Sequence, residues 1–132
     1  MNAAGSVDPR LQTFLALDFG AKLTGVAVGN RLLRQASPQP TIAAVAAAAR
    51  LDAVAQRVRE WQPDALVVGV PRHPDGAPHE NTARAQKFAR QLRERFRLPE
   101  FEEDERYSTT EALQDGARDA DAGAACEILD QF

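Results

Sequence analysis

The sequence predicts an α/β protein with a mixed five-stranded sheet flanked by helices. Two apolar runs of strand length, residues 13–19 and 65–70, have the continuous hydrophobic character of central strands that are covered on both faces. Two other segments, 42–61 and 82–96, carry apolar residues mostly at three- and four-residue steps, which is the period of an amphipathic helix. Because strands and helices alternate after the first three strands, the later strands are expected to join the sheet in parallel through crossovers.

The first three strands are expected to form a meander. The run TFLALDF (13–19) is followed after a short turn by LTGVAVGN (23–30), which predicts an antiparallel hairpin. The segment RLLRQAS (31–37) predicts a short third strand. Pro38 and Pro40 are expected to stop its regular pairing, because proline lacks the N–H that a sheet ladder needs.

Two helices and a central strand are expected in the middle of the chain. Thr41 is a candidate N-cap for the alanine-rich helix 42–61. The strand ALVVGV (65–70) follows, then a loop over 71–81 that is rich in turn residues, then the helix 82–96. The packing face of the first helix is predicted to contain Ile42, Val45, Ala49, Val54, Val58 and Trp61. That of the second is predicted to contain Ala85, Phe88, Ala89, Leu92 and Phe96.

The last third of the chain predicts one more strand followed by helical structure. LPEFEED (98–104) is expected to be a short strand, a helix is expected to begin within 105–112, a loop follows over 112–122, and 122–132 predicts a closing helix. The resulting order is three strands, helix, strand, helix, strand and helix. This is the order of the ribonuclease-H-like fold.

Size, charge and cysteine content limit the class of protein. The 132 residues suit one domain, expected over 13–132 after a disordered tail at 1–12 that lacks the features of a signal peptide. No apolar run approaches the roughly 18 residues of a membrane span. Cys126 is the only cysteine, so it is interpreted as a core-facing thiol or as half of an intermolecular disulfide, and the cytoplasm is the expected compartment. The net charge of −3 argues against a broadly basic nucleic-acid coat but allows a local basic face.

Three carboxylates stand where the predicted strands and helices meet. Asp18 ends the first strand, Glu105 ends the last strand, and Asp121 begins the last helix. Each alone also fits a structural role: hydrogen bonding to a turn, a surface acid, or a helix cap. In the proposed fold the three could meet in one cleft. Carboxylates without histidine or thiol partners suit Mg²⁺ or Mn²⁺, and two such ions can promote phosphodiester hydrolysis.

Basic residues concentrate on the second helix. RAQKFARQLRERFR (84–97) holds six cations against one acid, which predicts either a phosphate-contacting surface or a solvated helix face. His73 and His79 have no partners at the spacing of zinc ligands, so no zinc site is expected. The candidate nucleic-acid contacts are Lys22, Arg84, Lys87, Arg90 and Arg106.

Five segments in this order resemble the YqgF/RuvX-type family: LALDFGAKLTGVAVGN, LVVGVPRHPDG, ENTARAQKFARQL, DERYSTTEA and DADAGAACEILDQF. The resemblance covers residues 13–132 and implies a metal-dependent nuclease that matures the 5′ end of 16S rRNA in the bacterial cytoplasm. It assigns metal binding and catalysis to Asp18, Glu105 and Asp121. Asp104 matches a neighbouring family acid and, with Thr109, is expected to support the ligands, since adjacent strand residues point to opposite faces.

Other functions share parts of this pattern. The family is also described as Holliday-junction-resolvase-like, so a four-way DNA junction is an alternative substrate, and a ribosome-assembly module without catalysis is another interpretation. The segment 112–120 is shorter than in much of the family and holds only one basic residue, Arg118. LDFGAKLTGVAV also resembles the phosphate-binding hairpin of actin-like and sugar-kinase ATPases, but the chain is too short for their second lobe.

Overall fold

The computed structural model describes residues 9–72, 75, 77, 80–106, 125, 126, 128 and 129, and in 72 and 104–106 it describes the backbone alone. The described elements are β1 (Thr13–Phe19), β2 (Leu23–Asn30), β3 (Gln35–Ala43), α1 (Ala47–Trp61), β4 (Ala65–Arg72), α2 (Thr82–Phe96) and β5 (Glu100–Arg106). Ala125, Cys126, Ile128 and Leu129 are helical as well. No helix within the described ranges is both long and apolar enough to cross a membrane.

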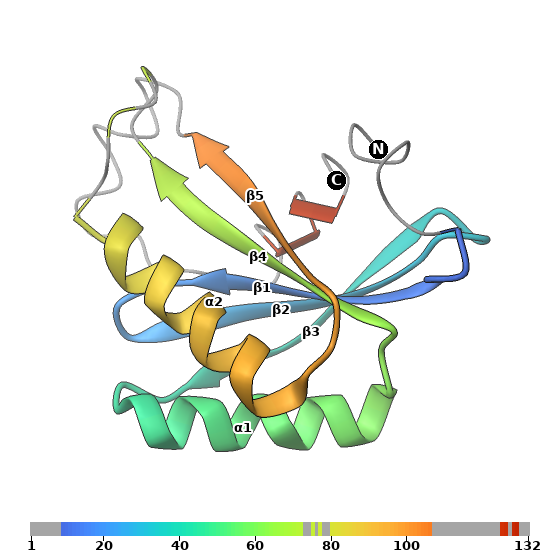
Figure 1. Ribbon diagram of the computed structural model, residues 1–132, viewed down its shortest axis with the longest axis horizontal. Coiled ribbons are helices and arrows are strands. Elements are labelled where there is room, and N and C mark those ends of the chain that lie inside the picture. The colour runs from blue at the N-terminus through green and yellow to red at the C-terminus, as the bar shows by residue number, and fades with distance from the viewer. Residues whose placement is uncertain are drawn as a thin grey trace.

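The five strands form one sheet in the order β3-β2-β1-β4-β5 (Figure 1). β1 pairs with β2, and β2 with β3, in antiparallel fashion, whereas β4 pairs in parallel with both β1 and β5. The predicted meander followed by parallel strands is therefore confirmed. This order places the apolar runs β1 and β4 at the centre of the sheet.

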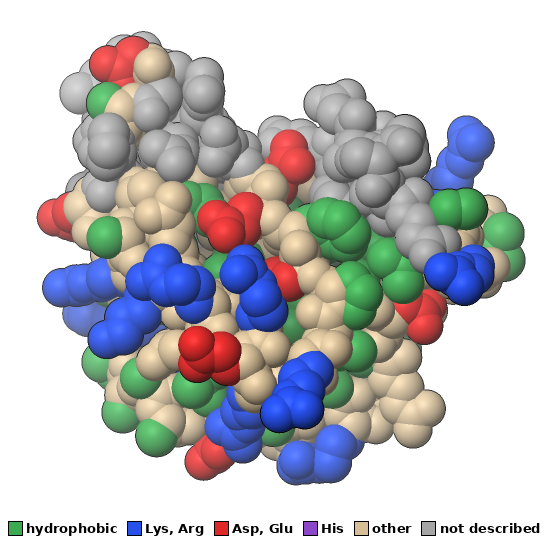
Figure 2. All heavy atoms as spheres, in the orientation of Figure 1, with side chains coloured by type: hydrophobic (Ala, Val, Ile, Leu, Met, Phe, Trp, Pro, Cys, Tyr) green, Lys and Arg blue, Asp and Glu red, His purple; other side chains and the backbone are tan. Residues whose placement is uncertain are grey.

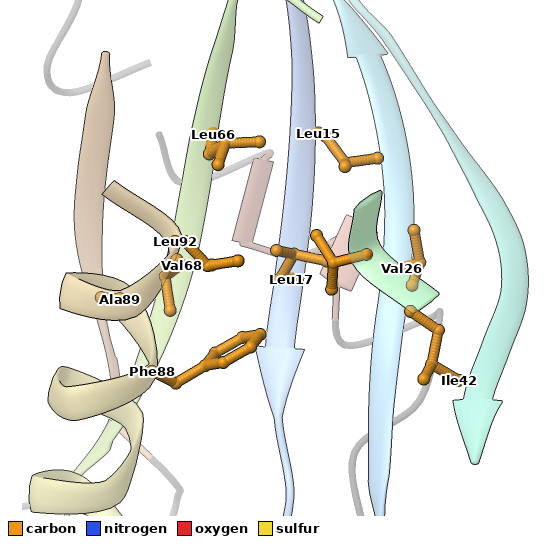
Figure 3. Close-up of a cluster of buried hydrophobic side chains, with 10 residues drawn as sticks. Leu15, Leu17, Val26, Ile42, Leu66, Val68, Phe88, Ala89 and Leu92 are labelled. Atoms are coloured by element: carbon orange, nitrogen blue, oxygen red, sulfur yellow. The ribbon is translucent and has the colours of Figure 1, made fainter. Parts of the chain in front are cut away.

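The alternation of side chains along β1 divides the core into two layers. Leu15 and Leu17 face α1 and α2, where they pack with side chains that include Phe88 and Leu92 (Figure 3). Phe14 and Ala16 face the other side and pack against the C-terminal helical residues Ala125, Ile128 and Leu129. Burial of both faces explains why β1 and β4 are almost continuously apolar.

β3 differs from its prediction. It spans Gln35–Ala43, and Pro38 and Pro40 lie within it. β3 is an edge strand that pairs only with β2, so its second row of backbone groups has no ladder to complete and proline is tolerated there. The exposed Leu32 and Leu33, which were expected in the strand, lie in the preceding turn.

The start of α1 was also predicted wrongly. Thr41 and Ile42 belong to β3, and the helix begins at Ala47 with Ala46 as an N-cap that makes no side-chain hydrogen bond. Ile42 is buried opposite Thr24 of β2, so strand pairing prevails over the helical preference of the alanines that follow.

The predicted packing face is only partly correct for α1 and is correct for α2. Val54 is buried and Val58 packs against the core, but the exposed fractions of Val45 and Trp61 are 70% and 38%. Ala49 is exposed as well. On α2 the prediction is confirmed: its first four predicted residues are buried, and Phe96 packs at the margin of the same layer.

Candidate active site

Asp18 is a buried carboxylate in the central strand of this sheet. It lies one residue before the end of β1, and only 3% of it is exposed. Its neighbours across the sheet are Gly25 on β2 and Gly69 on β4. Neither neighbour has a side chain, so at this level no side chain of β2 or β4 projects next to the carboxylate. By the alternation of β1, Asp18 shares the face of Phe14 and Ala16, opposite to α1 and α2.

Glu103 is a second acidic residue at the same level of the sheet. The register pairs Asp18 with Gly69, and Gly69 with Glu103 of β5. Phe101, two residues earlier, packs on the face of the sheet that Asp18 shares, so Glu103 belongs to that face too. Two strand spacings of about 4.8 Å each separate the backbones of Asp18 and Glu103. The sequence prediction missed Glu103, because only the parallel register selects it from the acids at 102–105.

The structure locates the other predicted acids only in part. Glu105 lies in β5 opposite Pro71, not at the start of a helix as expected, so that boundary was wrong. Its side chain and those of Asp104 and Arg106 lie outside the described part of the chain, as do Asp121 and Thr109 entirely. Among the side chains that are described, no three His, Cys, Asp or Glu residues gather as a metal site. The expected three-carboxylate cluster therefore stays a prediction.

Arg50 holds the turn that follows Asp18. It is 3% exposed, and its Nη1 donates hydrogen bonds to the Gly20 carbonyl and to Thr24 Oγ1, both at 2.7 Å. Its Nη2 donates to the Ala21 carbonyl at 3.0 Å, and its guanidinium carbon lies 4.4 Å from the centre of the Phe19 ring. The planar fork of arginine suits several acceptors at once. Sequence reasoning missed Arg50, since its partners are two backbone oxygens and a threonine hydroxyl about 30 residues away, which no residue pattern reveals.

The predicted basic surface is present on α2. Arg84, Lys87 and Arg90 are exposed there, and Lys22 is exposed in the β1–β2 turn. Figure 2 shows Lys and Arg side chains gathered over the α2 side of the molecule. Towards the end of α2, Arg93 pairs with Glu100 and Glu102 on β5, and Arg95 pairs with Asp52 on α1.

Cys126 and the two histidines have different outcomes. Cys126 is partly buried and packs against the layer formed by Phe14 and Ala16, in agreement with the core-facing interpretation. His73 and His79 lie outside the described residues, so the expected absence of a zinc site stays a prediction.

A family model described as "RuvX: Holliday junction resolvase" matches residues 12–132. The chain belongs to the RuvX family. This RuvX chain is 71% identical over 126 residues to a protein of Albidiferax ferrireducens named "Putative pre-16S rRNA nuclease", with 96% of this chain and 80% of the relative covered. A Polaromonas protein of the same name is 70% identical over 122 residues, with 92% and 88% covered.

The fold of this RuvX chain also resembles a solved structure. The Thermus RuvC chain of "T. thermophilus RuvC in complex with Holliday junction substrate" superposes with a TM-score of 0.58. The alignment covers 92% of this chain and 93% of that one at 11% sequence identity. At this identity the likeness concerns the fold, and it confirms the predicted ribonuclease-H-like architecture.

Proposed function

We propose that this RuvX-family chain is a metal-dependent nuclease that hydrolyses phosphodiester bonds in precursor 16S rRNA in the cytoplasm. The observation that carries the proposal is the buried Asp18 at the end of the central strand, level with Glu103 across a glycine. Two carboxylates on one face of the sheet, at the end of its central strand, are oxygen donors of the kind that Mg²⁺ and Mn²⁺ prefer. The names of the two relatives support the rRNA substrate.

The acidic residues would share the work of holding the ions. Asp18, Glu105 and Asp121 would provide carboxylate oxygens for Mg²⁺ or Mn²⁺, which are the ligands that these cations prefer. Glu103 adds a candidate ligand on the face of Asp18. When bound, the metal ions would lower the pKa of an attacking water and offset charge on the leaving oxygen. The chain's own role is to fix the carboxylates, and Arg50 contributes by holding the turn next to Asp18.

The basic residues would position the substrate. Lys22 lies in the turn after β1, and Arg84 and Lys87 lie in the first half of α2. Contacts of this kind are made to phosphates, so they fix the position of a nucleic acid and do not select its sequence. A four-way DNA junction is the second candidate substrate, favoured by the description of the family model.

Cleavage assays with Mg²⁺ or Mn²⁺ test the proposal. The substrates are 5′-extended 16S precursor RNA, free and in ribosomal particles, a four-way DNA junction, and ATP. We expect Asp18→Asn to reduce RNA cleavage by at least about 100-fold, because one metal ligand is lost. Cleavage of the junction alone would keep the mechanism and replace the substrate. No cleavage of either nucleic acid by the wild-type protein would refute the nuclease and favour an assembly module.

Glu103 has a matched control on the same strand. Glu102 directly precedes Glu103 and faces α2, where its Oε2 lies 3.9 Å from Nη2 of Arg93. We expect Glu103→Gln to weaken Mn²⁺ binding in calorimetry and to lower cleavage, whereas Glu102→Gln should change neither by more than about twofold. Equal behaviour of the two variants would remove Glu103 from the proposed site.

A further inference from the structure

An open pocket of about 250 Å³ lies behind Asp18, on the opposite face of the sheet. It is bounded by the β1–β2 turn, the start of α1 and the first half of α2. Phe19 follows Asp18 directly and lines the pocket, while Asp18 belongs to the other face. The pocket and the buried carboxylate are therefore found at the same end of β1.

The inner wall of the pocket is aromatic and firmly held. The rings of Phe19 and Phe88 lie with their centres 5.4 Å apart. The Arg50 guanidinium covers the Phe19 ring and is fixed by its hydrogen bonds to the turn. Val45, 70% exposed, forms an apolar part of the rim. Phe88 and Arg50 are each only 3% exposed, so the accessible apolar surface consists of the partly buried Phe19 and the Val45 rim. Unpaired bases pack against aromatic and apolar side chains of this kind in proteins.

The charge of the pocket is positive. Arg50, Arg84 and Lys87 line it, and none of its lining residues is acidic. Arg84 and Lys87 are exposed on α2, three residues apart, so they lie on neighbouring positions of one helix face. In contrast, Arg93 and Arg95 of the same helix form ion pairs with acids of this chain. The pocket thus combines an apolar wall with cations suited to an anion.

We propose that this pocket binds one unpaired nucleotide of a single-stranded RNA. The base would lie against Phe19 and the Val45 rim, and the phosphate would lie near Arg84 and Lys87. The volume corresponds to about eight waters at roughly 30 Å³ each, which is room for one ring system. The inference rests on the proposed function in that its ligand is RNA. It adds a preference for substrates that are unpaired near the cleaved bond, such as a single-stranded 5′ extension.

The test measures binding without cleavage. Fluorescence anisotropy with a labelled single-stranded RNA decamer is recorded in the presence of a chelator, using the full chain. Ala47→Phe would fill the pocket from an exposed position, and Ala48→Phe is the matched control at the next exposed residue, which does not line it. We expect Ala47→Phe to raise the Kd about 5- to 20-fold, as for loss of one stacked base, and Ala48→Phe to change it less than twofold.

Charge removal provides a second, independent measurement. Lys87→Ala should weaken binding and reduce the slope of log K against log salt by about 0.7, since one phosphate contact is lost. Arg59→Ala removes the same charge from an exposed position near the end of α1, remote from the pocket, and should leave the slope unchanged. These surface changes leave the core intact, and thermal unfolding confirms that each variant is folded.

The outcomes distinguish the contribution of the base to binding from that of its phosphate. They also distinguish failure of the pocket proposal from failure of the nuclease proposal. An RNA with an abasic residue at every position should bind the wild-type protein as weakly as the intact RNA binds Ala47→Phe. Equal affinity of Ala47→Phe and Ala48→Phe, or equally tight binding of a duplex, would overturn the proposal. If RNA cleavage is lost in Asp18→Asn while Ala47→Phe binds normally, the pocket proposal alone fails. If Ala47→Phe weakens binding but the wild-type protein cleaves no RNA, the nuclease proposal alone fails.

Discussion

Replacing Arg50 with methionine should destabilise the protein strongly, because one buried side chain connects α1 to the turn after β1. Its three hydrogen bonds to Gly20, Ala21 and Thr24 are 2.7, 3.0 and 2.7 Å long. At about 0.5–1.5 kcal/mol each, such hydrogen bonds contribute roughly 1.5–4.5 kcal/mol. The cation–π contact with Phe19 adds about 0.5–2 kcal/mol. Release of the guanidinium from its buried site offsets part of this sum, so we expect a loss of about 2–4 kcal/mol.

Arg57 offers a matched control on the same helix. It lies seven residues, or about two turns, after Arg50, and its buried Nη1 has no hydrogen-bond partner among the residues that the structure describes. Arg57→Met should therefore change stability by less than about 1 kcal/mol, since it removes no such bond. Urea unfolding followed by circular dichroism gives both values from the midpoint and the m-value.

A third variant separates charge from geometry. Arg50→Lys keeps the positive charge but cannot donate to three acceptors from a planar fork, so it should recover less than half of the loss. If Arg50→Met and Arg57→Met differ by less than about 0.5 kcal/mol, the assignment of the turn's stability to Arg50 is refuted.

The remaining predictions concern two acids and the core. Burial raises the pKa of Glu100 to about 7, against the opposing charge of Arg93, so native stability should fall as pH rises from about 4.5 to above 7. After allowance for solvent screening, Glu100→Gln should stabilise the protein by about 1–2 kcal/mol at pH 8 and have no effect near pH 4, as measured by urea unfolding. Asp64 accepts hydrogen bonds from the backbone N–H groups of Thr13 and Gln12, which lower its pKa, so its contribution is present above about pH 4 and is lost as pH falls further. Asp64→Asn should cost about 0.5–1 kcal/mol at pH 7 and nothing near pH 2, and an equal cost at both pH values would contradict this cause. Leu17→Ala should cost about 2–5 kcal/mol because this side chain is fully buried, whereas Leu33→Ala, at a residue that is 66% exposed, should cost less than about 0.5 kcal/mol in the same assay.

The elements that the sequence predicted well are those in which local pattern and burial agree. β1 and α2 have the predicted bounds, because a continuous apolar run and a helical stripe each have one favourable arrangement around a core. β3 and the start of α1 were misplaced where local preference and tertiary contacts compete. Prolines inside a strand are acceptable only at an edge, and the edge position of β3 follows from the assembled sheet.

The candidate site was predictable only in part. Asp18 is evident from the sequence, since a carboxylate that ends a central apolar strand requires an explanation. Glu103 is not evident, because the acids at 102–105 look alike until β5 pairs with β4 in a particular register. A shift of one residue would have placed the neighbouring acids on that face.

The sequence by itself determined the strand and helix order, the central carboxylate and the basic character of α2, all of which depend on residue type and local spacing. Only the tertiary structure decided that Glu103 is level with Asp18, that Arg50 holds the turn beside it, and that Arg84 and Lys87 line a pocket with Phe19. These contacts join residues that are about 30 to 85 positions apart in the chain. They depend on strand register and helix packing, which arise from the summed burial of the whole core and not from any local pattern.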